Sequence, residues 1–183
     1  MQKIPTIFDR DWDGSRKVID RYIIDPEKFS IATATEKLDG TNVRLTVRNH
    51  TLVRLEKRLN PSKVEKARGI EEPWYTDADE SDPGNKYIWE AARNTDLSVV
   101  PDGEWSGEAV GPKVQGNPLG LASHTVVLFS LGLAPVIKNV PTTYAELKEW
   151  LPKQMSQIGS HPIEGVVWHC SDGTMMKIKA KDF

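Results

Sequence analysis

Cysteine is almost missing from this sequence of 183 residues, in which Cys170 is the single example. One thiol cannot form a disulfide within the chain, so a reducing cytoplasm is the simplest location. The cysteine and the four histidines show none of the spacings typical of zinc ligands. No apolar run reaches the roughly eighteen residues of a membrane-spanning helix. The first residues also lack the apolar segment of a secretory signal.

A general excess of positive charge is missing too, since the net charge is −2, and this excludes an overall basic field for nucleic acid. The charge is unevenly distributed, however. Residues 54–68 hold six basic side chains against two acidic ones, and residues 71–82 hold six acidic side chains and no basic one. This pattern fits either a solvated surface or a local phosphate-binding patch beside an acidic loop. The P-loop pattern of many ATPases is absent.

Alternating apolar and polar residues predict an α+β fold of mostly antiparallel strands with a few short helices, in a single domain. Residues 41–48 form the clearest strand, in which Val43, Leu45 and Val47 share one face. A turn at Asn49 and His50 leads into the next strand. Further elements are predicted as follows: strands near 29–38, 52–58, 104–111 and 124–133; helices over 83–94 and after the capping box at Thr143–Glu146; a long loop or insertion over 60–84; and a hairpin over 163–180 turning at Asp172–Gly173.

The segment EKLDGTN, residues 36–42, places Lys37 at the end of a strand and before Asp39-Gly40. In one interpretation Asp39-Gly40 is a hairpin corner and Lys37 points into water. In the other, Lys37 is a nucleophile. The last strand favours the second interpretation, because alternation places Lys177, Lys179 and Lys181 on one face. Such a face belongs either to a solvent-exposed edge strand or to a surface that meets a polyanion.

These segments, taken in order, resemble the covalent nucleotidyltransferases, and most of all the ATP-dependent RNA ligases of the RNA ligase 2 type. The similarity lies in EKLDGTN, then GEAVGPKVQGN from residue 107, VVLFSL from 126, EGVV from 164 and KIKAKDF from 177. Ser130 departs from the pattern, because an aspartate is usual there. The resemblance implies a nucleotidyltransferase fold, an ATP-grasp-like ligase core of antiparallel sheets with short flanking helices.

The resemblance also implies a role for each matching residue. Lys37 would form a phosphoamide with AMP, and Lys177 and Lys179 would hold the phosphates. The other implied roles are adenine reading by Glu36, contact near the ribose by Asn42, phosphate or 3′-strand contact by Arg58, ribose binding by Glu108, purine stacking by Phe129 and metal binding by Glu164. The implied cofactors are ATP, as the substrate, and Mg²⁺ or Mn²⁺.

The chemistry explains why cations belong beside the nucleophile. A lysine amine attacks only when neutral, and lowering its pKa from ~10.4 to near neutrality requires roughly 4 kcal/mol. Lys177, Lys179 and a metal on Glu164 can supply that destabilisation of the charged amine. The same cations then stabilise the phosphate during in-line displacement.

The resemblance predicts joining of 5′-phosphate and 3′-hydroxyl ends of RNA, with DNA or hybrid ends left open. Ligases of this group usually carry a further domain after the last motif, but here that motif lies almost at the end of the sequence. Residues 1–183 are therefore expected to form one adenylation domain without an appended OB-fold or other domain. A protein partner is a candidate replacement for the missing domain. Two alternatives stay open: an enzyme that adenylylates or caps 5′ ends without sealing, and a non-catalytic nucleotide or nucleic-acid binder.

Overall fold

The computed structural model describes residues 3–130 and 133–183, and the chain divides into two compact units. The first unit is built on Asp39–Ala134, and the second unit consists of Ile4–Leu38 and Pro135–Phe183. Each unit has its own sheet and its own hydrophobic core. In the part of the chain that is described, no helix has the length and apolar character needed to cross a membrane.

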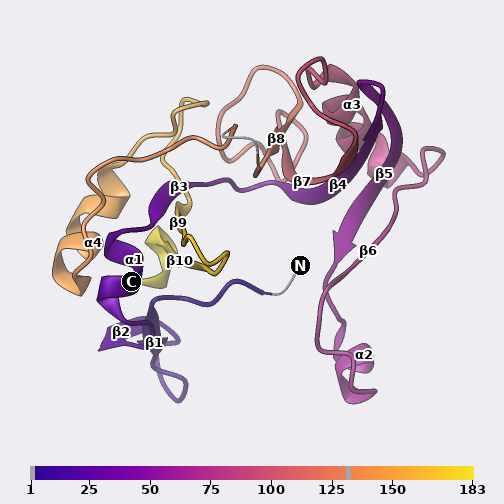
Figure 1. Ribbon diagram of the computed structural model, residues 1–183. Helices are drawn as coiled ribbons and strands as arrows, with labels where there is room; N and C mark the ends of the chain where they lie inside the picture. The colour runs from indigo at the N-terminus through magenta and orange to yellow at the C-terminus, as the bar shows by residue number, and fades with distance from the viewer. Residues whose placement is uncertain (1–2, 131–132) are drawn as a thin grey trace. The chain divides into compact units, whose positions relative to one another are not determined.

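The first unit contains a five-stranded antiparallel sheet in the order β6-β5-β4-β7-β8 (Figure 1). The strands are β4 (Thr41–Arg48), β5 (Thr51–Leu59), β6 (Trp74–Asp77), β7 (Gly103–Val110) and β8 (Thr125–Leu128). The helix α3 (Lys86–Asn94), which follows a 3₁₀ turn at Pro83–Asn85, covers one face of the sheet. The predicted α+β class with antiparallel strands is confirmed.

The alternation predicted in residues 41–48 is also confirmed, because Val43, Leu45 and Val47 are fully buried against α3. Ile88, Ala91 and Ala92 supply the buried side of the helix, as its helical spacing requires. The turn after β4 places Asn49 and His50 in the left-handed region, with φ of 49° and 58°. A two-residue hairpin with both central φ values positive matches the right-handed twist of its strands.

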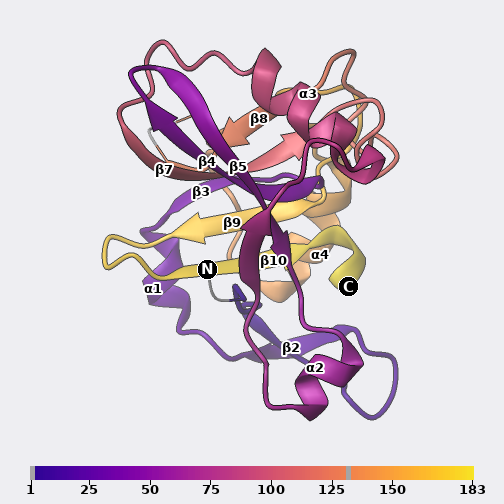
Figure 2. The same cartoon turned by 90° about the vertical axis from the view of Figure 1, so that its right-hand side faces the viewer.

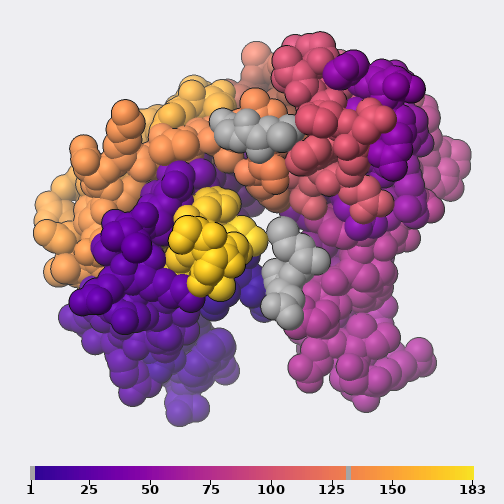
Figure 3. Space-filling view, viewed as in Figure 1, coloured from indigo at the N-terminus to yellow at the C-terminus, as the bar shows by residue number. Residues whose placement is uncertain are grey.

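Residues 60–84 were expected to be a long loop or an insertion, and the prediction of a loop is wrong. Ser62 and Glu65 form a reciprocal capping box that starts α2 (Lys63–Ala67), and β6 pairs with β5 in the same segment. The helix lies at the end of the arm between β5 and β6 (Figures 1 and 2). It has no buried residue, and the magenta atoms of this arm extend from the unit in Figure 3.

The second unit contains a three-stranded antiparallel sheet in the order β10-β9-β3, whose strands lie side by side in Figure 2. These are β3 (Thr33–Lys37), β9 (Gly165–His169) and β10 (Met175–Lys179). A small sheet of β1 (Phe8–Arg10) and β2 (Val18–Tyr22) accompanies them, with α1 (Pro26–Ser30), α4 (Tyr144–Trp150) and 3₁₀ turns at Leu151–Lys153 and Ala180–Asp182. The core side of the sheet contributes Trp168, Met176 and Ile178.

Local sequence signals set the boundaries of these elements. Asp25 caps α1 and Pro26 occupies its first turn, whereas Thr143 caps α4 and its hydroxyl contacts the carboxylate of Glu146 at 2.6 Å. The predicted hairpin of β9 and β10 is confirmed, with Gly173 in its turn at a φ of 80°. The predicted strand over 124–133 is present only as β8, and residues 131 and 132 of that prediction lie outside the described residues.

Candidate functional site

Lys37 is the last residue of β3, and its neighbours across the sheet explain its surroundings. Gly165 of β9 pairs with Lys37 on one side and with Lys179 of β10 on the other. Residues that lie directly opposite each other share a face of the sheet, so Lys37 and Lys179 project from the same face. The side chain of Lys37 is only 20% exposed, and therefore the interpretation in which it points into water is wrong.

The hairpin-corner interpretation of Asp39-Gly40 is wrong as well. The strand before it, β3, pairs with β9, whereas the strand after it, β4, pairs with β5 and β7. The two flanking strands therefore belong to different sheets. Gly40 is required for another reason, since a Cβ atom there would lie 2.1 Å from the carbonyl oxygen of Ala109.

Gly165 has a comparable steric role in the second unit. A Cβ atom at this position would lie 2.1 Å from the carbonyl oxygen of Ile178, a distance that no real side chain adopts. Glycine thus allows the close approach of β10 to β9. This approach brings Lys179 beside the preceding residue, Glu164.

Glu164 is the carboxylate around which the lysines gather. It accepts from Nζ of Lys37 at 2.5 Å and from Nζ of Lys179 at 2.9 Å, while Nζ of Lys181 lies 3.9 Å away. The Glu164 side chain is only 9% exposed. Burial raises the pKa of this carboxyl, but the two close ammonium groups outweigh burial and hold the pKa below its usual value.

Lys177 lies on the same face, opposite Val167 and two residues before Lys179. Burial is the main cause that lowers its pKa to about 8, and the positive charges of Lys179 and Lys37 lower it further. Glu164 and Asp182 act in the opposite direction, but Asp182 is already paired with Arg10 at 2.9 Å. Lys37, Lys177 and Lys179 therefore share one face with a single carboxylate, which pairs closely with two of them, and the arrangement has an excess of positive charge.

Glu36 is not brought to this face. It precedes Lys37 on the same strand and pairs with Val166, so its side chain points to the opposite side of the sheet. The residue is 3% exposed, and one carboxylate oxygen accepts the backbone N–H of Gln157 at 2.9 Å. Its other oxygen, Oε1, is buried without a hydrogen-bond partner among the described residues. Its part in adenine reading stays a prediction based on the resemblance.

Asn42 and Glu108 belong to the first unit, where they lie directly opposite each other on β4 and β7. Nδ2 of Asn42 is 3.4 Å from Oε2 of Glu108, and the backbone N–H of Gly40 donates to Oε1 at 3.1 Å. Both side chains project from the face of the sheet opposite α3. The structure thus brings together the two residues predicted to lie near a ribose.

Phe129 and Arg58 lie on the same polar face of that sheet. Val127 pairs with Glu108, and alternation therefore places Phe129, two residues later, on the Glu108 side. Phe129 is half-buried, and its backbone N–H donates to the carbonyl of Ser106 at 3.0 Å. Arg58 pairs with Tyr75 across β5 and β6.

Sequence reasoning did not identify four further members of this face: Arg44, Glu56, Tyr75 and Ser106. Arg44 binds Glu56 through two hydrogen bonds of 2.6 and 2.8 Å. The period of two in residues 41–48 already places Arg44 on the side of Asn42. The partners of Arg44 depend on strand register, however, and an irregularity at Thr46/Val47 shifts the pairing with β5.

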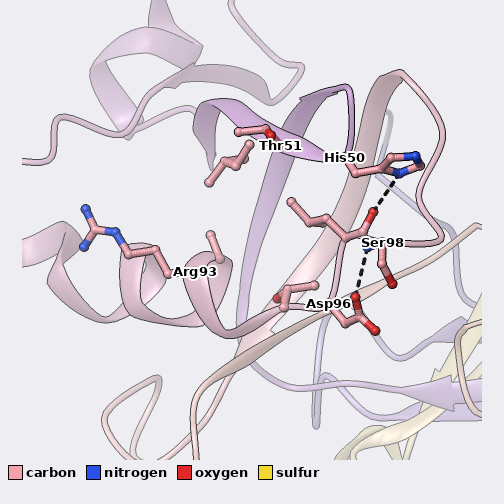
Figure 4. A pocket seen from close by; sticks show the side chains of 9 residues that line it. His50, Thr51, Arg93, Asp96 and Ser98 are labelled. Atoms are coloured by element: carbon pink, nitrogen blue, oxygen red, sulfur yellow. Dashed lines mark hydrogen bonds between the residues drawn. The ribbon is translucent and has the colours of Figure 1, made fainter.

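The first unit also has a hollow of about 440 Å³ near the β4–β5 turn and the end of α3. In Figure 4 the ring of His50 points toward Leu97, whose carbonyl lies 3.3 Å from Nδ1, and Arg93 points away to the other side. Asp96 accepts the backbone N–H of Ser98 at 2.9 Å. His50 and Asp96 are thus engaged in local hydrogen bonds within the lining of the hollow. None of the residues predicted to act on a nucleotide lines this hollow.

Comparison with solved structures defines the class of fold. An RNA ligase of Naegleria gruberi with pyrophosphate is 14% identical over 99% of this chain and 58% of its own length, with a TM-score of 0.56. A mutant of that ligase with AMP and manganese gives 14% identity, 98% and 62% coverage, and a TM-score of 0.57. The chain shares the fold of the matched part of this RNA ligase, and this agrees with the fold that its motifs predicted.

Sequence comparison finds similarity to one family over the second half of the chain. Residues 95–183 match the family model described as RNA ligase 1. RNA ligase 1 of Pongo abelii is 36% identical over 89 residues, covering 45% of this chain and 26% of that protein. RNA ligase 1 of Danio rerio is 38% identical over 74 residues, covering 39% and 22%. The similarity spans about a quarter of the length of these curated relatives.

Proposed function

We propose that this chain is the adenylyl-transferring core of an ATP-dependent RNA ligase, with Lys37 as the nucleophile. The observation that carries the proposal is that Lys37 and Lys179 both pair with Glu164 at one end of the three-stranded sheet, with Lys177 on the same face. One carboxylate among three ammonium groups leaves an excess of positive charge that suits a polyphosphate. The RNA ligase fold and the similarity to RNA ligase 1 support the same reaction.

In the first step Nζ of Lys37 attacks the α-phosphorus of ATP. A nitrogen–phosphorus bond forms, the bond to the bridging oxygen breaks, and pyrophosphate leaves with its electron pair. Lys37 donates to Glu164, so it must lose a proton and this hydrogen bond before it attacks. The phosphates compete with Glu164 for the ammonium groups, and Lys177 and Lys179 then stabilise the charge that develops.

In the second step the 5′-phosphate of an RNA end attacks the same phosphorus, and the lysine leaves. In the third step a 3′-hydroxyl attacks the activated 5′-phosphate and releases AMP. The nucleotide contacts proposed for Asn42, Glu108, Phe129 and Arg58, and the adenine contact proposed for Glu36, rest on the motif resemblance. The two compact units are proposed to act as one adenylation domain, and a cytoplasmic location rests on the single cysteine.

A divalent cation, Mg²⁺ or Mn²⁺, fits this proposal as a companion of ATP. Among the described residues no group of three or more histidine, cysteine or acidic side chains could hold a metal. Mg²⁺, however, commonly binds through one or two carboxylates together with the substrate phosphates, and Glu164 is a suitable carboxylate. When bound, the cation would neutralise charge on the phosphates.

The proposal is tested by intact-protein mass after incubation with ATP and Mg²⁺. The wild-type chain should gain the mass of one AMP, and Lys37→Ala should gain none. Lys181→Ala is the matched control, because Lys181 is 69% exposed and lies at the margin of the cluster, and it should label like the wild type. Equal labelling of the Lys37→Ala protein contradicts the mechanism.

Two further measurements separate ligation from its alternatives. Incubation with each nucleoside triphosphate in turn identifies the nucleotide that is transferred. Incubation of the labelled protein with nicked duplex RNA then separates sealing from end activation alone, because a ligase yields a joined strand and free AMP. A chain that binds ATP but never acquires its mass is a binder, and the proposed enzyme activity is then wrong.

A further inference from the structure

The polar face of the five-stranded sheet carries a chain of hydrogen bonds that begins at Tyr75. The Tyr75 hydroxyl donates to Oδ1 of Asn42 at 2.7 Å and lies 3.1 Å from Oγ of Ser106. Because Oδ1 is engaged by the hydroxyl, the NH₂ group of Asn42 faces Glu108, with Nδ2 at 3.4 Å from Oε2. The hydroxyl of Tyr75 therefore determines how Asn42 presents its amide to this carboxylate.

The ring of Tyr75 is itself held in place. The guanidinium carbon of Arg44 lies 4.6 Å from the ring centroid, which is a cation–π contact. Arg44 is in turn fixed by its two hydrogen bonds to Glu56, which is only 2% exposed. A planar guanidinium held at two points by a buried carboxylate has little freedom, and so it forms a rigid support for the ring.

Strands far apart in the sequence contribute to this arrangement. Tyr75 comes from β6, Glu56 from β5, Asn42 and Arg44 from β4, and Glu108 from β7. Buried ionic groups can often be replaced by apolar residues without loss of stability, so folding alone does not require this network. Its hydrogen bonds end at Asn42 and Glu108, which points to a role in orienting these two side chains.

We infer that Tyr75 is a positioning residue for ribose recognition, acting through Asn42 on Glu108. This inference rests on the proposed function. Tyr75 does not touch the reacting atoms. Its hydroxyl fixes the Asn42 amide, and the amide, on Oε2, together with the backbone N–H of Gly40, on Oε1, holds the Glu108 carboxylate in the orientation that accepts a hydrogen bond from a ribose hydroxyl of ATP.

The first test compares ATP with 2′-deoxy-ATP and 3′-deoxy-ATP as donors of the adenylyl group. Tyr75→Phe removes one oxygen and leaves the ring over Arg44. We expect kcat/KM for ATP to fall roughly three- to tenfold, mainly through KM, and the preference for ATP over one deoxy analogue to shrink by a similar factor. Unchanged preference for ATP over both analogues overturns the inference. The preference is a ratio within one preparation and is independent of the fraction folded.

A double-mutant cycle tests whether Tyr75 acts through Asn42. If it does, Asn42→Ala alone should reduce the preference for ATP, and adding Tyr75→Phe should change it by less than about twofold. Full additivity of the two losses means that Tyr75 acts by another route, and the inference is then wrong.

Tyr87→Phe is the matched control, because it removes the same oxygen in the same unit, from a ring that stacks on His124 at 5.2 Å. It should leave the preference for ATP unchanged, and an equal loss in this variant contradicts a specific role for Tyr75. The inference and the proposed function fail in different ways. Absence of the AMP adduct in the wild-type chain removes both, whereas a normal adduct with unchanged preference in Tyr75→Phe removes only the inference.

Discussion

The three-stranded sheet of the second unit and the five-stranded sheet of the first both carry charged residues on a polar face, but they balance charge differently. On the three-stranded sheet, Lys37 and Lys179 pair with Glu164, and Lys177 lies on the same face without a close acidic partner of its own among the described residues. On the five-stranded sheet, Glu56 has a close guanidinium partner in Arg44. The first arrangement retains an uncompensated positive charge, and the second is close to neutral.

This difference matches the two kinds of ligand group that a nucleotide offers. A polyphosphate needs uncompensated cations, whose mutual repulsion in the free protein is relieved when the anion binds. A ribose needs oriented donors and acceptors, and these are best supplied by a network in which every side chain is already fixed. Substitutions on each sheet test this contrast between the three-stranded sheet, which is charge-strained because its cations exceed its anions, and the five-stranded sheet, which is charge-satisfied because its charges are paired.

The largest effect is expected from Glu164→Gln on the charge-strained sheet. The substitution removes the carboxylate proposed to hold the divalent cation beside the phosphates, and formation of the AMP adduct should slow by roughly a hundredfold or more. Quenched-flow labelling with α-labelled ATP measures the rate. Glu149→Gln is the control, because Glu149 forms an exposed ion pair with Lys153, and it should leave the rate unchanged.

The same variant also changes the response to acid. The pKa of Glu164 is lower in the folded protein than its ordinary value, so the stability it contributes is present above that ordinary value and is lost as pH falls through the folded pKa. Unfolding by urea across the acid range should therefore show a weaker pH dependence for Glu164→Gln than for the wild type. An identical slope would contradict the ion pairs as drawn.

On the charge-satisfied sheet, Glu56→Ala should produce the largest loss of stability. It leaves Arg44 without its buried partner, and the unfolding free energy should fall by about 3 kcal/mol, the lower end of the range for a broken buried pair, because Arg44 is partly exposed. Glu104→Ala is the matched control. Glu104 pairs with the same guanidinium at 3.1 Å but is 49% exposed, and its loss should cost less than about 1 kcal/mol. Equal losses of unfolding free energy in the two variants would contradict the special importance of the buried pair between Glu56 and Arg44.

Lys177→Met should have the opposite effect on stability. Burial lowers the pKa of Lys177 to about 8, below the unfolded value of 10.5, so the folded state resists protonation. Stability is therefore reduced below pH 8 and recovers as pH rises toward 10.5. After discounting for partial exposure, the variant should be more stable by about 1 kcal/mol at pH 7, and should form far less AMP adduct. Lys181→Met, at an exposed position, should change neither stability nor adduct formation. If Lys177→Met gains stability only at high pH, the lowered pKa of Lys177 is contradicted.

The sequence predicted those features that depend on neighbouring residues or on simple periodicity. The faces of β4, the cap of α4, the hairpin turn at Asp172-Gly173 and the common face of Lys177 and Lys179 all follow from such local rules. The motif order predicted the fold. The pairing of Lys37 with Glu164 came only from the resemblance, because 127 residues separate them in the chain.

What the sequence did not predict depends on register between distant strands. The contact of Tyr75 with Asn42 requires β6, β5 and β4 to be aligned, and an irregularity in the pairing of β4 with β5 changes that alignment. The sequence analysis missed both α2 and β6, which lie within residues 60–84. The helix α2 is exposed and has no buried residue, so no apolar periodicity indicates it. Strand alternation places the Glu36 side chain on the other face of β3 from Lys37, whereas the resemblance implied only that Glu36 reads adenine.

The smallest effect on stability is expected from Arg58→Met. Arg58 is a cation on the otherwise charge-satisfied sheet, and its Nε is buried without a hydrogen-bond partner among the described residues. Its Nη2 has only a long contact of 3.4 Å to Asn60. Because little native bonding is lost, urea unfolding should change by less than about 0.5 kcal/mol, whereas KM for ATP or for the RNA end should rise roughly three- to tenfold. Arg93→Met, which breaks an exposed pair with Glu80, should match it in stability but leave both KM values unchanged. A loss of stability above 1 kcal/mol with unchanged KM values would mean that Arg58 stabilises its sheet and does not bind a ligand. Every charge on that polar face would then have a structural role.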